Sequence, residues 1–95
     1  RVSAKEAFEL GFVNEVVAPS DLMPAARRWA EQIVECAPLS VRASKQMAME
    51  GLRYGSVEEA TTARYDQLRA MVKSRDFIEG PRAFAEKRKP SWSGK

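Results

Sequence analysis

The sequence predicts a mainly α-helical fold on the strength of three observations. Serine and glutamate stand three residues apart ahead of apolar segments, at Ser3/Glu6 and Ser56/Glu59, which is the capping-box signature of a helix start. Apolar residues then recur at helical spacing, and single prolines and glycines interrupt the pattern at short intervals. The chain has 95 residues and no repeat or long linker, so we expect one helical domain over residues 1–95.

The first predicted helix begins at Ser3 and ends at Gly11, which can adopt the left-handed conformation that closes a helix. Residues 13–17, which are rich in valine, predict one short strand stopped by Pro19. A single strand leaves its amides and carbonyls unpaired. We therefore expect its partner to lie outside this chain.

Four more helices are predicted downstream. The second runs from Ser20-Asp21 to Pro38, with an apolar face of Leu22, Ala26, Trp29, Ile33 and Ala37. The third covers residues 39–53, the fourth residues 57–73, and the fifth follows Ser74. Gly80-Pro81 predicts a kink or break in the fifth helix, and residues 90–95 are expected to form an irregular tail.

Composition excludes some kinds of site. The chain has one cysteine, Cys36, and no histidine, so neither an internal disulfide nor a zinc or iron site is expected. We assign Cys36 to packing as a small buried hydrophobe. No segment has the roughly 20 consecutive apolar residues of a membrane span, and the N-terminus does not resemble a signal peptide, so no membrane partner is expected. We expect a cytoplasmic protein, with an organelle matrix as the open alternative.

Two carboxylate pairs, Glu58/Glu59 and Glu31/Glu35, are the candidates for acid/base catalysis. The first pair falls in the first turn of a predicted helix, where negative charge is favourable, and the second lies beside arginines at ion-pairing spacing. We therefore assign no catalytic residue in this chain. There is also no glycine-rich phosphate loop and no nucleophile elbow.

The remaining candidate is the basic cluster Lys87-Arg88-Lys89, with Arg82 one or two turns earlier. The net charge of +3 is uneven, because the second half of the chain carries most of the cations. Such a cluster can donate charge-assisted hydrogen bonds to phosphate. It can equally be a solvated helix end that offsets the helix dipole.

Three segments, in order, resemble the enoyl-CoA hydratase (crotonase) family. They are Arg1-Val2-Ser3-Ala4-Lys5-Glu6-Ala7 followed by Gly11-Phe12-Val13-Asn14-Glu15-Val16-Val17, then 29–38 with Ser44-Lys45, and finally Ser74-Arg75-Asp76 through Glu86-Lys87-Arg88 and Pro90-Ser91-Trp92. The last segment is most similar to the carnitinyl-CoA dehydratase-like branch. The resemblance implies a C-terminal helical trimerisation domain, with the ββα core and its catalytic glutamates and oxyanion hole lying upstream of this chain.

The resemblance also implies a function and a set of contacts. The parent would hydrate or dehydrate a 2-enoyl-CoA thioester as a trimer or hexamer, and this segment would join subunits and cover the acyl-CoA site. Lys87 matches a lysine near the adenine and phosphate end of coenzyme A, and Leu68 matches a position that lines the adenine in some members. No covalently bound cofactor is implied, and residues 1–95 alone are expected to lack hydratase turnover.

Two other classes of function are left open by the residues themselves. One is a non-catalytic helical module that associates with itself through exposed apolar faces. The other, which we favour less, is a weak nucleic-acid-binding module, suggested by an isoelectric point of about 9.3. No helix clusters the Arg, Asn and Gln side chains that read bases, so we expect no nucleic-acid partner.

Overall fold

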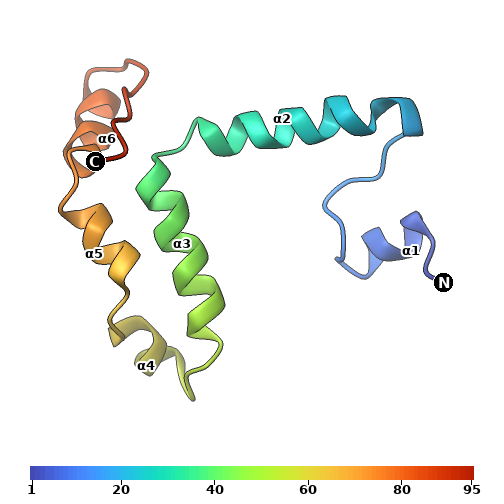
Figure 1. Cartoon of the computed structure of the whole chain (residues 1–95), viewed down its shortest axis with the longest axis horizontal. Coiled ribbons are helices and arrows are strands. Elements are labelled where there is room, and N and C mark those ends of the chain that lie inside the picture. Colours follow the sequence, from blue (N-terminus) through green and yellow to red (C-terminus); the bar gives the residue numbers. More distant parts are fainter. The chain divides into compact units, whose positions relative to one another are not determined.

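The computed structural model describes residues 1–95 and is helical throughout its regular structure, with no strand. Its contacts divide the chain into two compact units, Arg1–Gln32 and Ile33–Lys95, which are described separately. Figure 1 shows the order of the helices along the chain. The mainly α fold class is thereby confirmed. None of these helices is both long enough and apolar enough to cross a membrane.

Helix α1 (Ala4–Glu9) opens the first unit between the two caps that the sequence predicts. The Ser3 hydroxyl accepts from the Glu6 amide at 3.2 Å, and the Glu6 carboxylate accepts from the Ser3 amide at 2.8 Å. Hydrogen bonding from the Ser3 hydroxyl and the Ser3 amide lowers the pKa of the Glu6 carboxyl. At the other end Gly11 has φ +76°, and the amides of Gly11 and Phe12 donate to the carbonyls of Phe8 and Ala7. This is a Schellman motif with glycine at the left-handed position.

The predicted strand at residues 13–17 is wrong, because this segment is irregular. No other extended segment of the chain pairs with it, so no ladder of backbone hydrogen bonds forms. Side chains hold it instead: the Glu15 carboxylate accepts from the Trp29 indole at 2.8 Å and from the Arg28 guanidinium. The indole and the guanidinium lower the pKa of Glu15. The segment is therefore fastened to α2 (Leu22–Val34), which follows the short 3-10 helix Pro19–Asp21.

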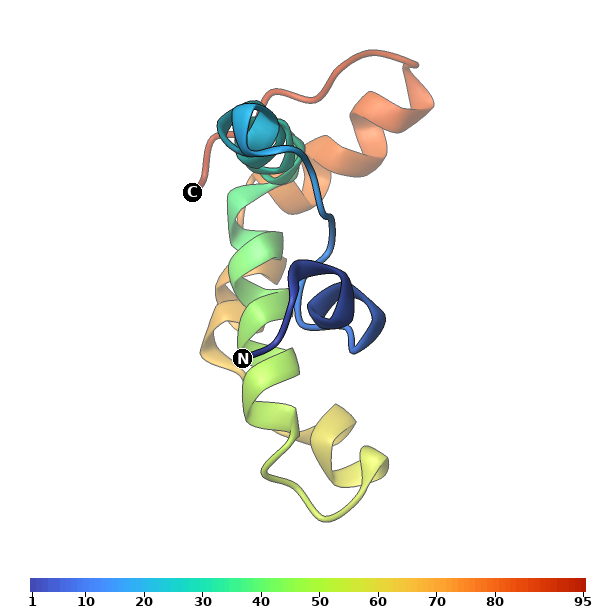
Figure 2. The same cartoon turned by 90° about the vertical axis from the view of Figure 1, so that its right-hand side faces the viewer.

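The second unit packs helix α3 (Pro38–Gly51) against helix α5 (Asp66–Val72), with α4 (Val57–Thr62) joining them (Figures 1 and 2). Leu39 and Ala43 of α3 are buried, together with Tyr65 at the start of α5. The Gln46 side chain accepts from the Gln67 amide at 2.9 Å, which satisfies a donor in the first turn of α5. The small core of this unit therefore lies between α3 and α5.

The predicted fourth helix over residues 57–73 is two helices, α4 and α5. Backbone at Ala63 and Tyr65 is extended, which ends α4 and directs the Tyr65 side chain into the core. There the Tyr65 hydroxyl donates to the Ala60 carbonyl at 2.7 Å, and its ring meets Tyr54 edge to face at 6.4 Å. Burial raises the pKa of Tyr65. Packing of one aromatic residue thus overrides the helical pattern on either side of it.

Helix α6 (Asp76–Ala85) is continuous, so a break at Gly80-Pro81 is wrong, whereas the alternative of a kink there stays a prediction. Proline removes one amide from the helical ladder, but bonds made by residues on both sides of it keep the helix together. The Ser74 hydroxyl accepts from the Phe77 amide at 3.2 Å, as expected of a residue that caps this helix. Residues after α6 turn back over it, as Figure 2 shows.

Several residues predicted to be buried are exposed. On α2, Leu22, Trp29 and Ile33 are all exposed. Cys36, assigned above to packing, is also exposed, because α2 ends at Val34 and leaves it in the following turn. Two further apolar side chains, Phe84 of α6 and Leu52 after α3, are 86% and 83% exposed. The chain therefore makes apolar faces that it does not itself cover.

Replacing Ala43 by leucine should destabilise the second unit by about 1–3 kcal/mol, because overpacking strains a close helix contact. Ala43 belongs to α3, the helix that packs against α5, and is only 2% exposed. The measurement is the free energy of unfolding in urea. Ala48→Leu on the exposed face of the same helix is the matched control and should change little. Equal effects of the two substitutions would contradict the assigned core.

Candidate functional site

The tail after α6 is fastened to the first turn of that helix by Asp76, whose side chain is almost fully buried. One carboxylate oxygen accepts from the Ser93 amide at 2.7 Å and from the Ser93 hydroxyl at 2.8 Å, and the other accepts from the Gly94 amide at 2.8 Å. Next to it, the Arg75 amide donates to the Lys95 carbonyl at 2.8 Å. Hydrogen bonds from Ser93 and Gly94 lower the pKa of Asp76.

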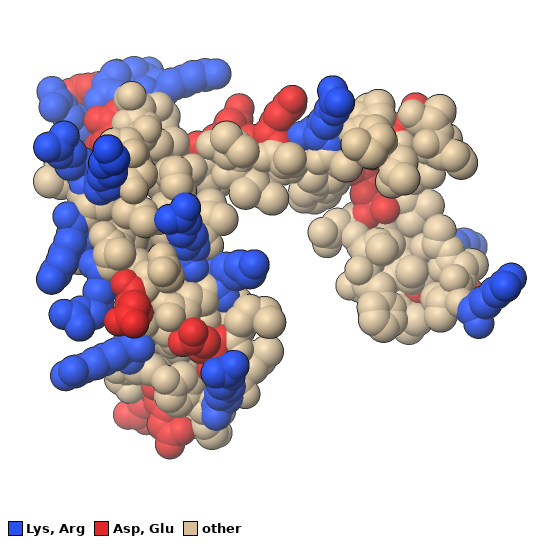
Figure 3. Space-filling model, in the orientation of Figure 1, with Lys and Arg blue, Asp and Glu red and all other residues tan.

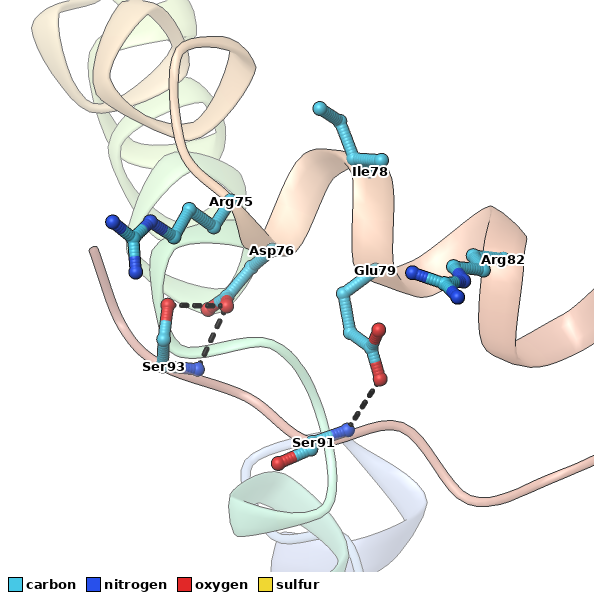
Figure 4. A pocket seen from close by; sticks show the side chains of 7 residues that line it. All are labelled: Arg75, Asp76, Ile78, Glu79, Arg82, Ser91 and Ser93. Carbon is cyan, nitrogen blue, oxygen red and sulfur yellow. Dashed lines mark hydrogen bonds between the residues drawn. The ribbon is translucent and has the colours of Figure 1, made fainter.

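Glu79, one turn further along α6, makes the second attachment. Its two carboxylate oxygens accept from the two terminal nitrogens of Arg88 at 2.6 and 3.0 Å, a bidentate pair, and one of them also accepts from the Ser91 amide at 2.8 Å. The Arg88 guanidinium, followed by the Ser91 amide, lowers the pKa of Glu79 to about 2. Figure 4 shows Asp76 and Glu79 both pointing from α6 toward the tail. They line an open groove of about 350 Å³ with Arg75, Ile78, Arg82, Ser91 and Ser93.

Trp92 provides a third attachment. Its indole donates to the Glu35 carbonyl at 2.8 Å, just beyond α2. The ring also lies over Gly80, where an added Cβ would come within 3.4 Å of it, so glycine at this position allows the close approach. A second open groove, of about 370 Å³, is lined here by Val34, Glu35, Lys89, Pro90 and Trp92.

Between α6 and the tail, the turn at Lys87 has a conformation that is unusual for its residue type. Lys87 has φ +52° and is the one non-glycine residue of the chain with positive φ. The amides of Lys87 and Arg88 donate to the carbonyls of Phe84 and Ala83 at 3.2 and 3.0 Å, the Schellman pattern that ends α1 at Gly11. A side chain in this conformation costs about 1–2 kcal/mol. Lys87 therefore stands where glycine is the favoured residue.

In the basic cluster the arginines form ion pairs and the lysines do not. Glu86 accepts from Arg82 at 2.9 Å and from Arg88 at 2.6 Å, and these bonds lower its pKa. Hydrogen bonds to Glu79 and to Glu86 raise the pKa of Arg88. Lys87 and Lys89 form no ion pair. The charges of these two lysines are therefore available to an anionic ligand. Figure 3 shows Lys and Arg side chains gathered over α5 and α6.

The structure places the two predicted cofactor contacts on different elements. Lys87 is exposed at the turn after α6, whereas Leu68 is half-buried on α5. Neither lines the two grooves described above. Both assignments stay predictions. Asp76, Glu79 and Trp92 belong to the segment that carries the family resemblance, but no contact was predicted for them. A local signal of the attachment is the acidic pair three residues apart in the first turn of α6.

The carboxylates that are candidates for acid/base catalysis cap a helix or are exposed to solvent. The Glu59 side chain accepts from the Gly55 amide at 3.0 Å, and its own amide donates to the Ser56 hydroxyl at 3.1 Å, so it belongs to the cap of α4. Glu31 and Glu35 are exposed on and beyond the last turns of α2. No three His, Cys, Asp or Glu side chains of the chain converge as metal ligands would. The distinctive geometry of the chain is therefore the cationic turn after α6.

These observations define the chain as a helical segment with uncovered apolar faces and a cationic turn held by its own C-terminal residues. The family model for enoyl-CoA hydratase/isomerase matches residues 1–95. The chain belongs to the enoyl-CoA hydratase/isomerase family.

Similar proteins agree on this family. A carnitinyl-CoA dehydratase from Salmonella arizonae is 41% identical over 99% of this chain and 37% of its own length. Among solved structures, an enoyl-CoA hydratase/isomerase from Mycobacterium paratuberculosis gives a TM-score of 0.90 at 34% identity, over 98% of this chain and 36% of the other. An enoyl-CoA hydratase from Mycobacterium marinum gives 0.86 at 37% identity, over 99% and 38%. The chain thus spans a little over a third of the proteins it matches.

Lys87→Gly should stabilise the second unit by up to about 1 kcal/mol, because glycine adopts positive φ without a steric cost, although it gains more freedom in the unfolded chain. The measurement is the free energy of unfolding in urea. Gly11→Ala, at the equivalent position after α1, is the reciprocal control and should destabilise its own unit. Loss of stability in Lys87→Gly would show that the lysine side chain makes a stabilising contact.

The tail should detach from α6 when the pH becomes acidic. Because the pKa of Glu79 falls from its ordinary 4.5 to about 2 on folding, its contribution is fully present above about pH 4.5 and is lost as the pH falls through 2. Asp76, whose pKa is also lowered, acts in the same direction. With Trp29→Phe as background, fluorescence of Trp92 should stay constant from neutral pH to about 4.5 and change below it. A transition near pH 6 would contradict these attachments.

Proposed function

We propose that residues 1–95 form the C-terminal helical segment of an enoyl-CoA hydratase/isomerase-family enzyme, where they join subunits into a trimer or hexamer and cover the acyl-CoA site. Membership of the family over the whole chain supports this proposal. So does the share matched in the relatives, a little over a third of their length, since the remainder can hold a catalytic core. The enzyme is cytoplasmic.

The single observation that carries the proposal is the uncovered apolar surface of the helices. Val57, Ile78 and Phe84 are 81%, 71% and 86% exposed. Large apolar side chains exposed on helix after helix indicate that other surfaces pack on this segment. A catalytic core and neighbouring subunits of the same enzyme are the partners that family membership favours.

In this enzyme Lys87 contacts the phosphate end of coenzyme A, and Leu68 packs near the adenine. Lys87 suits the role because its ammonium is exposed and forms no ion pair within the chain. Leucine can pack against a base but cannot stack on it as an aromatic ring does. The lysine therefore contributes more to recognition of the nucleotide than the leucine does.

The reaction is addition or removal of water across the double bond of a 2-enoyl-CoA thioester. Dehydration is favoured by the similarity to carnitinyl-CoA dehydratases. Negative charge on the thioester oxygen needs two converging amide donors, and proton transfer needs positioned carboxylates. Both are supplied by parts of the enzyme outside residues 1–95, and this segment alone has no hydratase turnover.

Lys87→Ala in a complete enzyme that contains residues 1–95 should weaken binding of a CoA thioester by roughly tenfold, the loss expected for one charge-assisted contact with phosphate. The measurement compares Kd for crotonyl-CoA by titration calorimetry. Binding of the same acyl group on pantetheine, which lacks the nucleotide, should not change. Lys5→Ala, which removes the same charge from exposed helix α1, is the matched control.

The same variants distinguish the proposal from a purely structural module. Sedimentation or light scattering gives the subunit number of each variant beside its affinity. A cofactor contact predicts weaker affinity at unchanged subunit number. Unchanged affinity with a smaller assembly would support a module that only associates, and it would contradict the contact proposed for Lys87.

A further inference from the structure

The turn that presents Lys87 is held by two carboxylates, Glu79 of α6 and Glu86, the residue that follows the helix. On the N-terminal side, Glu86 accepts from the Nε of Arg88 at 2.6 Å. On the C-terminal side, Glu79 accepts from the Ser91 amide at 2.8 Å. Arg88 itself bridges to Glu79 with both terminal nitrogens, at 2.6 and 3.0 Å. The Glu86–Arg88 bond thus spans Lys87, and the residues after Lys87 are tied to α6 through Glu79.

Arg88 makes more of these ties than any other residue of the turn. Its amide donates to the Ala83 carbonyl at 3.0 Å, its guanidinium spans Glu79 and Glu86, and one terminal nitrogen reaches the Lys89 carbonyl at 3.2 Å. A guanidinium committed to two carboxylates has few donors left for a ligand. Arg88 is therefore unlike Lys87, whose ammonium has no anionic partner in the chain.

The conformation of Lys87 makes these ties necessary. A lysine at positive φ is disfavoured and persists only when its surroundings hold it there. Gly11, at the equivalent position after α1, has φ +76° and needs no such support. Losing the tie between Arg88 and Glu79 would let Lys87 relax to negative φ, and its ammonium would then point in another direction.

We propose that Arg88, clamped by Glu79, is a positioning residue that aims the Lys87 ammonium at the phosphate of a bound CoA thioester. The inference rests on the proposed function of Lys87. It differs from direct electrostatic attraction, in which Arg88 would contact the phosphate and Glu79 would repel it. For one substitution, the two accounts predict opposite changes in the affinity for a CoA thioester.

Glu79→Gln is that substitution. It removes a negative charge close to Lys87 and leaves Arg88 without its bidentate partner, so direct attraction predicts tighter binding of crotonyl-CoA. Positioning predicts weaker binding, by roughly three- to tenfold. This lies in the lower part of the range of coupling between residues in contact. The crotonyl thioester of pantetheine, which lacks the nucleotide, should bind as before. Glu9→Gln, which removes the same charge from the exposed Lys5 pair on α1, should leave CoA affinity unchanged.

A double-substitution cycle with Arg88→Gln and Lys87→Ala completes the test. If Arg88 acts through Lys87, Arg88→Gln weakens CoA binding in the native background and has no further effect once Lys87 is alanine. Arg88→Lys keeps the charge but loses the fork, so it should behave like Arg88→Gln. Circular dichroism and subunit number establish that each variant is folded and assembled.

Each outcome decides between the accounts. Tighter binding in Glu79→Gln, full rescue by Arg88→Lys, or additive effects of Arg88→Gln and Lys87→Ala would overturn the positioning role while leaving the Lys87 contact in place. Unchanged CoA affinity in Lys87→Ala would overturn the contact itself, and the positioning role with it. Weakening of the pantetheine thioester in parallel with the CoA thioester would show a general structural defect, and would also overturn the inference.

Discussion

The hydrogen bonds from the tail to the Asp76 and Glu79 carboxylates are the constraint on which the C-terminal part of the structure depends. Residues 90–95 form neither helix nor strand, so their amides need acceptors from elsewhere. Two carboxylates one helical turn apart supply them, because side chains three residues apart lie on the same face of a helix. The position of Trp92 over Gly80 follows from the same attachments.

These carboxylates also determine how charge is distributed around the turn. Residues 64–95 contain nine Lys and Arg but four Asp and Glu. Asp76 and Glu79 lie in the first turn of α6, where the helix dipole favours negative charge, and Glu79 and Glu86 pair with arginines rather than lysines. Bidentate geometry explains that preference, since a carboxylate matches the guanidinium fork and not a lysine ammonium. In the cluster at 87–89, Lys87 and Lys89 are left without an ion pair.

Features fixed by neighbouring residues could be predicted from the sequence, and features fixed by distant ones could not. The Ser3 and Ser56 caps and the end of α1 at Gly11 depend on residues within a few positions, and their signatures are local. The break between α4 and α5 depends on burial of Tyr65 against α3, and the unpaired segment at 13–17 depends on Trp29 of a later helix. Local propensity carries no information on such contacts.

The same distinction explains why the candidate site was predicted only in part. The cations at 87–89 are visible in the sequence, but the division between paired Arg88 and unpaired Lys87 arises from Glu79, nine residues away from Arg88. Positive φ at Lys87 could not be predicted either. The Schellman motif is normally inferred from a glycine, and here a lysine occupies the glycine position. A residue held against its preference needs support from outside its own turn. That support, rather than the charge of the cluster, is what separates Lys87 from a lysine on any solvated helix end.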